Sequence, residues 1–230
     1  MKRAIVITLF SVLLAGAWGG WWLFTDKSAP LFKPIEYYQL SGEFHYVKPK
    51  EVNEVLDHYL GHSFWAVELN EIQTKLTYLD WVNKALVKRR WPNQLYVEIE
   101  EQIPFARWGE KGLVTQSGEV FYPKNREGFE GLVRVTGELS ESKKILVSLE
   151  EFQQKLSEIG FVMISLTHQV DGVWQMELLN GSQIILDDRK ALHKLGRFIT
   201  AYPQLAEPLR KSPQMYDLRY SNGFIVGKTP

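Results

Sequence analysis

Only a few residues of this chain have a type and spacing that could support chemistry. His58 and His62 lie four residues apart in a helical pattern, which would let two imidazoles reach one metal ion. No HExxH motif surrounds them and no third ligand is near in the sequence, so surface histidines at a helix end are the simpler interpretation. Glu98, Glu100 and Glu101 could act as an acid–base pair, but the solvated polar face of a strand explains them better.

Two charged dipeptides are also ambiguous. Asp187-Asp188 stands where a helix needs an N-cap, so capping is the expected role. Arg89-Arg90 could hold an anionic lipid or ligand, with ordinary solvated charge as the alternative. The sequence has no nucleophile elbow, phosphate-cradling glycine loop or dinucleotide fingerprint. We therefore predict no catalytic residue, no metal site and no cofactor, and expect a protein that is not an enzyme.

The amino-acid composition argues against a nucleic-acid partner and excludes chemistry that needs cysteine. The 230 residues carry 27 basic and 27 acidic side chains, and this neutral balance gives no reason to expect a nucleic-acid partner. Cysteine is absent, which excludes thiol redox chemistry, iron–sulfur clusters and thiolate zinc sites. Without disulfides, the folded part of the chain must be held together by its apolar core alone.

An uncharged, mostly apolar run of 21 residues extends from Ala4 to Phe24. A helix of this length spans about 31 Å, close to the thickness of a bilayer core. Lys2 and Arg3 precede the run, and three tryptophans lie at its far end, where aromatic rings favour the membrane interface. We predict a cytoplasmic N-terminus at residues 1–3, a transmembrane helix at 4–24 and a linker at 25–34, with the rest of the chain exported.

A cleaved signal peptide is the alternative for this segment. Ala15-Gly16-Ala17 resembles a cleavage site, and cleavage would release a secreted periplasmic binding protein or enzyme. The apolar run continues for seven residues beyond Ala17, which is longer than a signal peptide needs. We favour the uncleaved anchor.

The first exported segment has the pattern of a small α+β domain. Strand patterns cover Ile35–Leu40, Ala85–Trp91 and Leu95–Glu101, and helical spacing covers Pro49–Leu60 and a segment that begins at Asn70. Asn70 is expected to cap the second helix through its side chain. The order strand, helix, helix, strand, strand predicts two helices on one face of a three-stranded sheet.

Beyond Pro104 the pattern becomes mostly β. Strands are expected at residues 113–115, 119–122, 132–135, 161–170, 173–179, 182–186, 215–220 and 224–227. Helices are expected at residues 148–159, with Ser148 and Glu151 as a capping box, and at about 188–202. These assignments predict a mostly antiparallel β domain with two helices.

The last predicted strand ends almost at the C-terminus, so nothing remains to cover it. An uncovered strand offers unpaired N–H and C=O groups, and a partner strand could pair with them. The alternative is an edge kept harmless by its shortness, by Gly227 and by Lys228.

A series of longer motifs connects these elements with a known family. The series comprises Ser63–Leu69, Ile72-Gln73, Leu79–Val82, Val87–Pro92 and Glu101–Trp108, and it continues with Gly118, Phe121, Gly196–Phe198, Tyr202-Pro203 and Asp217–Tyr220. In order and spacing it resembles the FtsQ/DivIB family of bacterial cell-division proteins. The resemblance implies a POTRA domain at residues 35–104 and an FtsQ-type β domain at 105–230.

The same resemblance implies a function and partners. Members of the family are non-enzymatic divisome scaffolds, anchored by a single helix in the inner membrane and concentrated at the division septum. They bind FtsB and FtsL and so support septal peptidoglycan synthesis, with FtsK, FtsW and FtsI as further contacts.

In the family, FtsB adds a strand to the last strand of the β domain. Carried over to this sequence, the contact comprises Arg219, Tyr220, Asn222, Gly223, Phe224, Ile225, Val226, Gly227 and Lys228. This sequence departs from the enterobacterial pattern in two ways. Lys228 stands where an aromatic residue contributes to the FtsB contact. The predicted cytoplasmic tail has only three residues, too few for a sizeable cytoplasmic docking segment.

Overall fold

The structure is a computed structural model that describes residues 14–19, 21, 33–211 and 213–228. The chain divides into two compact units, Met1–Gln102 and Ile103–Pro230. Most of the transmembrane helix predicted at 4–24, the tail at 1–3 and most of the linker lie outside the described residues, although residues 14–19 and Trp21 are helical. Within the part of the chain that the structure describes, no helix is long and apolar enough to span a membrane.

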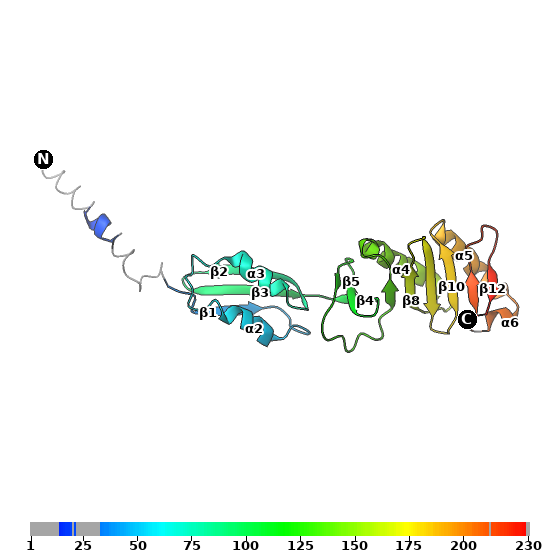
Figure 1. Ribbon diagram of the computed structural model, residues 1–230, viewed down its shortest axis with the longest axis horizontal. Helices are drawn as coiled ribbons and strands as arrows, with labels where there is room; N and C mark the ends of the chain where they lie inside the picture. Colours follow the sequence, from blue (N-terminus) through cyan, green and yellow to red (C-terminus); the bar gives the residue numbers. More distant parts are fainter. Residues whose placement is uncertain (1–13, 20, 22–32, 212, 229–230) are drawn as a thin grey trace, which may run out of the picture. The chain divides into compact units, whose positions relative to one another are not determined.

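The first unit is a three-stranded sheet with two helices (Figure 1). Its elements are β1 (Tyr37–Ser41), α2 (Pro49–Asp57), α3 (Leu69–Thr77), β2 (Val82–Arg90) and β3 (Gln94–Glu101). The strand order is β1-β3-β2, with β1 parallel and β2 antiparallel to the central β3. This confirms the predicted order of strands and helices.

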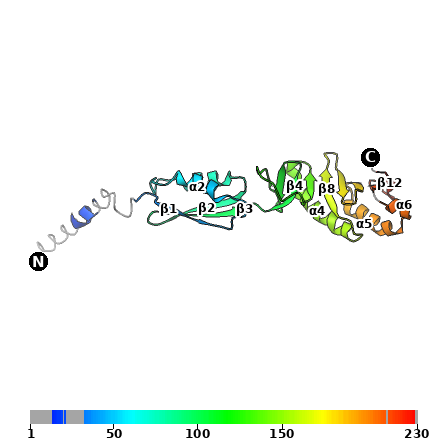
Figure 2. The ribbon, with the colours of Figure 1, turned by 90° about the horizontal axis from the view of Figure 1, so that it is seen from below.

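Periodic apolar residues build the core of this unit. Val52 and Leu56 on α2, and Ile72 and Leu76 on α3, are all at most 1% exposed because their spacing places them on one face of each helix. Alternate residues of β2 and β3 are buried against these helices, and Figure 2 shows α2 lying on one face of the sheet. The opposite face of the sheet carries mostly polar side chains, with Leu86 exposed among them.

The helix ends of the first unit differ from the prediction. Helix α2 ends at Asp57 rather than Leu60. Helix α3 begins at Leu69 with Glu68 at the N-cap position and no side-chain capping bond, so Asn70 lies inside the first turn and does not cap the helix.

The second unit contains one large sheet. Its elements are β4 (Pro104–Trp108), β5 (Gly112–Thr115), β6 (Val120–Phe121), β7 (Arg134–Thr136), η2 (Leu139–Glu141), α4 (Ser142–Ser157), β8 (Met163–His168), β9 (Val173–Leu178), β10 (Gln183–Asp187), α5 (Ala191–Ala201), η3 (Tyr202–Gln204), α6 (Glu207–Arg210), β11 (Met215–Asp217) and β12 (Ile225–Gly227). The nine strands are ordered β12-β11-β10-β9-β8-β7-β4-β5-β6.

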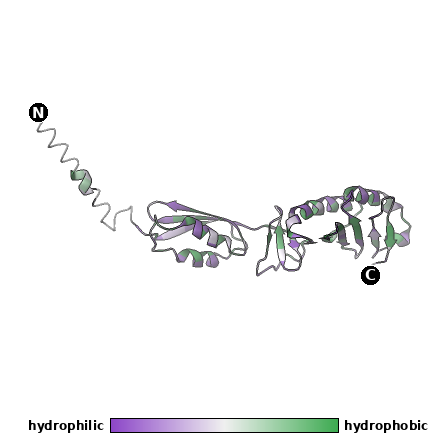
Figure 3. Ribbon diagram, turned by 45° about the horizontal axis from the view of Figure 1, so that its top comes forward, coloured by the Kyte–Doolittle hydropathy of each residue, from purple (hydrophilic) through white to green (hydrophobic). Residues whose placement is uncertain are grey.

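This sheet is mixed rather than simply antiparallel. Strands β10 and β11, β4 and β7, and β7 and β8 pair in parallel, while the other neighbouring strands are antiparallel. Strand β4 was not among the predicted strands. Helices α4 and α5 lie on one face of the sheet, and Figure 3 shows hydrophilic and hydrophobic stretches alternating along these helices.

Both long helices of the second unit start elsewhere than predicted. Helix α4 begins at Ser142, so Ser148 and Glu151 lie within it and form no capping box. The Ser142 hydroxyl instead donates to the carbonyl of Gly118, 2.6 Å away. Helix α5 begins at Ala191, preceded by Lys190 in a left-handed conformation with no side-chain cap.

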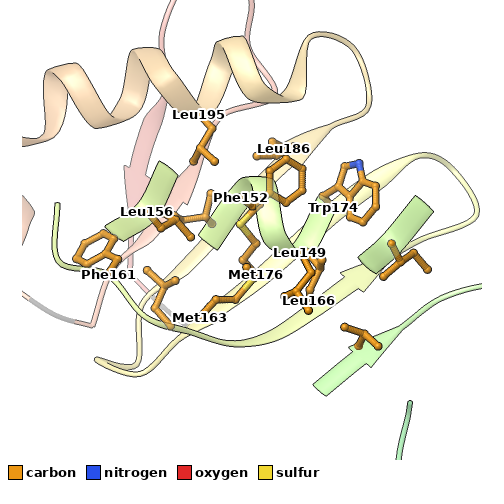
Figure 4. Packing of buried hydrophobic residues seen from close by; sticks show 14 of the residues in the cluster. Leu149, Phe152, Leu156, Phe161, Met163, Leu166, Trp174, Met176, Leu186 and Leu195 are labelled. Atoms are coloured by element: carbon orange, nitrogen blue, oxygen red, sulfur yellow. The ribbon is translucent and has the colours of Figure 1, made fainter. Parts of the chain in front are cut away.

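The core of the second unit lies between these helices and the sheet. Figure 4 shows Leu149, Phe152 and Leu156 of α4 directed toward the sheet side chains. The ring of Phe152 meets that of Trp174 edge to face, with centroids 5.4 Å apart. Since this core has no disulfide, its apolar packing must supply the stability of the unit.

Candidate partner-binding edge

Strand β12 is the terminal strand of the nine-stranded sheet. Among the residues that the structure describes, it pairs with β11 alone, and it lies at the end of the row of strands that includes β8 and β10 (Figure 1). A terminal strand has one side on which its backbone groups face no neighbouring strand. The geometry of β11 determines which residues of β12 direct their backbone groups to that open side.

Two hydrogen bonds give the orientation of β11. The carbonyl of Gln214 accepts from the N–H of Gln183 at 2.9 Å, and the N–H of Leu218 donates to the carbonyl of Ile185 at 2.7 Å. The backbone groups of alternate strand residues point to opposite neighbours. Even-numbered residues of β11 therefore face β10, and odd-numbered residues face β12.

The register between β11 and β12 then identifies the residue of β12 whose backbone N–H and C=O face away from β11. Met215 lies opposite Gly227, and Asp217 lies opposite Ile225. Because Met215 and Asp217 face β12, Ile225 and Gly227 face β11 in return. Val226, between them, directs its N–H and C=O toward the open side of the sheet.

The side chains of this strand are divided between core and solvent. Val226 and Phe224 pack against the core of the second unit, and the Phe224 ring meets Phe198 of α5 edge to face at 5.2 Å. Ile225 is 51% exposed on the opposite face. The strand is thus anchored on one face and available along its edge.

The turn before β12 is held by an arginine of α5. The guanidinium of Arg197 donates to the carbonyls of Tyr220 at 3.0 Å, of Gly223 at 3.4 Å and of Ser221. One planar cation with several N–H groups can satisfy a set of converging carbonyls. Arg197 therefore fixes the path of the chain that leads into the edge strand.

A buried lysine supports the same turn one helical turn earlier on α5. The Lys194 ammonium lies 2.7 Å and 2.8 Å from the two carboxylate oxygens of Asp187 and 2.9 Å from the carbonyl of Arg219. Asp187 thus pairs with Lys194, whereas Asp188 accepts from the Trp174 indole and pairs with Lys144. The prediction that Asp187-Asp188 caps the helix is wrong, because both carboxylates have partners elsewhere in the fold.

Arg219 and Asp217 form an ion pair at the end of β11. The Arg219 guanidinium donates to both carboxylate oxygens of Asp217, at 3.0 Å and 2.7 Å, which is the bidentate geometry of a strong pair. The hydrogen bonds from Arg219 hold the pKa of Asp217 below its ordinary value, and the same pair raises the pKa of Arg219.

The nine residues expected at the partner contact therefore lie in one hairpin. Five of the nine are exposed, namely Arg219, Tyr220, Asn222, Ile225 and Lys228, and the others are partly buried. Lys194 and Arg197 were not predicted, because their distance in sequence from the hairpin leaves no local signal. Arg197 belongs to the Gly196–Phe198 motif of the family resemblance, and Lys194 lies three residues earlier on the same face of the helix.

The other residues singled out by type lie in the first unit. The rings of His58 and His62 lie 5.8 Å apart, and the described residues contain no group of three or more possible metal ligands. Glu101 accepts the backbone N–H groups of residues 45–47, and its side chain is 7% exposed. For Glu101 the prediction of a solvated strand face is therefore wrong, whereas Glu100 pairs with Lys84 at the surface.

Arg89 and Arg90 also differ in their surroundings. The guanidinium of Arg89 donates to the carbonyls of Phe64, Trp65 and Val67 and so fixes the loop before α3. Arg89 is thus neither a ligand site nor ordinary solvated charge. Arg90 is exposed and donates to the side chain of Gln39.

Comparison with known proteins matches each unit to a family model. Residues 33–102 match the FtsQ-type POTRA domain, and residues 106–219 match the C-terminal domain of cell division protein FtsQ/DivIB. The "Cell division protein FtsQ" of Allochromatium vinosum is 31% identical over 228 residues, which is 99% of this chain and 90% of that protein. The protein of the same name from Xanthomonas campestris is 32% identical over 84% of this chain and 69% of that protein.

The Cellvibrio japonicus protein of that name is 30% identical over 90% of this chain, and the match spans 65% of its own length. The class is thus an α+β protein with a POTRA domain followed by an FtsQ/DivIB C-terminal domain. The chain belongs to the FtsQ/DivIB family of cell division proteins. The hairpin from Tyr220 onward lies beyond the residues matched by the family model.

Proposed function

We propose that this protein is a non-enzymatic scaffold of the cell-division complex that binds a partner by strand addition to β12. The observation that carries the proposal is the open edge at Val226, where an N–H and a C=O face away from the sheet. Main-chain hydrogen bonds at such an edge supply affinity, and neighbouring side chains supply specificity.

The proposed partner is FtsB together with FtsL, through which the protein supports septal peptidoglycan synthesis. The contact comprises the hairpin residues already described, from Arg219 to Lys228. Tyr220, in the turn that precedes β12, is 50% exposed, and tyrosine is among the residues that contribute most to binding at interfaces. FtsK, FtsW and FtsI are proposed as further contacts of the assembled complex.

The proposed topology is single-pass in the inner membrane, with concentration at the division septum. Residues 1–3 are cytoplasmic, 4–24 span the bilayer, 25–34 form the linker, and the POTRA domain (35–104) and β domain (105–230) are periplasmic. The mature protein then retains Met1 or Lys2 in an intact-mass measurement. An N-terminus at Trp18 would instead support cleavage and a secreted binding protein or enzyme.

Proline substitutions at adjacent positions test strand addition. Val226→Pro removes a donor on the open edge, so we expect loss of FtsB–FtsL binding in a pull-down with little change in the fold. Ile225→Pro removes a donor that faces β11 and is expected to lower the melting temperature. Val226→Ala, which keeps the N–H and shortens the side chain, is the matched control and should still bind.

Tyr220→Ala tests the contact by a different route, since it removes aromatic area and leaves the backbone intact. We expect weaker binding with the circular dichroism and melting behaviour of the parent. If Val226→Pro and Tyr220→Ala are both folded and bind FtsB–FtsL like the parent, the interface is elsewhere and the proposal fails.

A further inference from the structure

The first unit has a well-defined end at which the chain enters it. The N–H of Ile35 donates to the backbone carbonyl of His62 at 2.9 Å, and the N–H of Glu36 donates to the backbone carbonyl of Asn93 at 3.0 Å. We call residues 33–37, 61–68 and 88–94 the proximal end. The chain leaves the unit after Gln102, at the opposite end of β3, because β3 runs away from the proximal end.

Two exposed tryptophans lie at this proximal end. Trp65 is 54% exposed and Trp91 is 62% exposed, whereas Trp81 at the opposite end of the sheet is 8% exposed. The backbone of Trp65 is held by Arg89, whose guanidinium donates to its carbonyl at 3.1 Å. The backbone that carries the Trp65 ring is therefore held in place, and Trp91 directly follows the last residue of β2.

The charge of the proximal end is positive. It contains four basic residues and two acidic ones, which gives a formal net charge of +2 in a chain that is neutral as a whole. The basic residues are Lys33, Lys88, Arg89 and Arg90, and the acidic ones are Glu36 and Glu68. Tryptophan beside lysine and arginine is the combination that favours the headgroup region of an anionic bilayer.

The length of the preceding chain sets how far this end can be from a membrane. Nine residues, Thr25–Lys33, separate the apolar run from Pro34. Fully extended, they span at most about 32 Å. Provided that the proposed anchor spans the bilayer, the proximal end is thus confined to a thin layer above it.

We propose that the proximal end of the first unit docks on the surface of a bilayer that contains anionic phospholipid. Trp65 and Trp91 contact the headgroup region, and Lys88 and Arg90 interact with the phosphates. The inference rests on the anchor in the proposed function, and it adds a second, lipid-facing surface that is separate from the β12 edge.

Site-specific fluorescence quenching in the full chain tests this docking. The chain contains no cysteine, so Ala66→Cys places one label beside Trp65, and Glu43→Cys places one beyond the C-terminal end of β1, away from the proximal end. Both positions are exposed. In vesicles of phosphatidylethanolamine and phosphatidylglycerol with nitroxide headgroups, we expect quenching at position 66 to exceed that at 43 by about twofold or more.

Three variants assign the effect to the named residues. Trp65→Ala with Trp91→Ala should reduce quenching at position 66 to the level at 43, and Tyr78→Ala, which removes an exposed aromatic ring of α3's C-cap, should not. Lys88→Gln with Arg90→Gln should abolish the difference between vesicles with and without phosphatidylglycerol. Circular dichroism serves as the control that each variant is folded.

The outcomes separate this proposal from the proposed function. Equal quenching at positions 66 and 43 in a chain that stays in the membrane at high pH overturns the docking and leaves the anchor intact. Release of the chain at high pH overturns the anchor and the docking with it. If the tryptophan variant is quenched like the parent but loses a co-purifying protein, the surface serves a protein partner and the lipid proposal is wrong.

Discussion

Lys194 and Arg197 lie one helical turn apart on α5 and donate to carbonyls along the turn that precedes β12. Lys194→Met should therefore lower the free energy of unfolding by about 3 kcal/mol, because it leaves the Asp187 carboxylate without its partner. The side chains of this pair are only 10% and 23% exposed. Urea denaturation of the purified protein measures the change.

The matched control is Lys211→Met. Lys211 pairs with Glu207 at 3.1 Å, but both side chains are more than 70% exposed. Exposed pairs contribute less than about 1 kcal/mol, so this variant should be nearly as stable as the parent. Equal effects of the two substitutions would contradict the structural role assigned to Lys194.

The Asp217–Arg219 pair predicts a dependence of stability on pH. The folded state lowers the pKa of Asp217, so the pair stabilises the fold fully above the ordinary carboxyl pKa of 3.8. This contribution is lost as the pH falls from there through the lowered pKa. Arg219→Gln should thus reduce the free energy of unfolding at pH 7. Between pH 5 and pH 2, the free energy of unfolding measured by urea titration should fall less steeply in this variant than in the parent. A parallel acid profile for variant and parent would refute this account.

Ile72 and Leu76 form the buried face of helix α3, and a substitution there should lower stability. Leu76 is fully buried, and Leu76→Ala should cost about 2–5 kcal/mol of stability in the first unit. Thr77→Ala, one residue along and on the exposed side of the helix, is the matched control and should cost much less. A thermal midpoint that does not change in Leu76→Ala would mean that the helix faces another way.

The sequence predicted β3, α2 and α3 from the periodic burial of their residues. Apolar residues alternate along β3 and recur every three or four residues on α2 and α3, because one face of each element is buried. This pattern can be recognised within each short segment of sequence. Helix starts were less predictable, since Asn70 and Ser148 are good capping types but lie inside their helices. Strand β4 was missed although it pairs with the nearby β5 as well as with the distant β7. Its pairing with β5 has a register shift between Pro104 and Ala106, so its pattern is irregular.

In the candidate site, features set by neighbouring residues could be predicted from the sequence, whereas contacts between distant residues could not. The Asn222-Gly223 turn and the uncovered last strand could be predicted from the sequence, and the family resemblance added the contact residues. The roles of Lys194 and Arg197 could not be predicted, because nothing near them in sequence indicates the carbonyls that they bind. Asp187 was misassigned for the same reason, since its partner is a side chain on the following helix.

At the scale of the whole molecule, the two units have separate cores. The apolar cluster beneath the β12 edge is built from residues of the second unit alone. Leu76→Ala should therefore destabilise the first unit while FtsB–FtsL binding, measured below the unfolding temperature, stays like that of the parent. Loss of binding in this variant would show that the edge depends on the first unit.

In the proposed complex, a partner strand pairs with the open side of β12 at Val226. Residue-resolved hydrogen exchange measures this directly, with the full chain alone and saturated with FtsB–FtsL. We expect the Val226 amide to exchange quickly in the free protein and to be protected on binding. The Ile225 amide, which faces β11, should be protected in both states. An unchanged exchange rate at Val226 in the saturated complex would contradict strand addition at this edge.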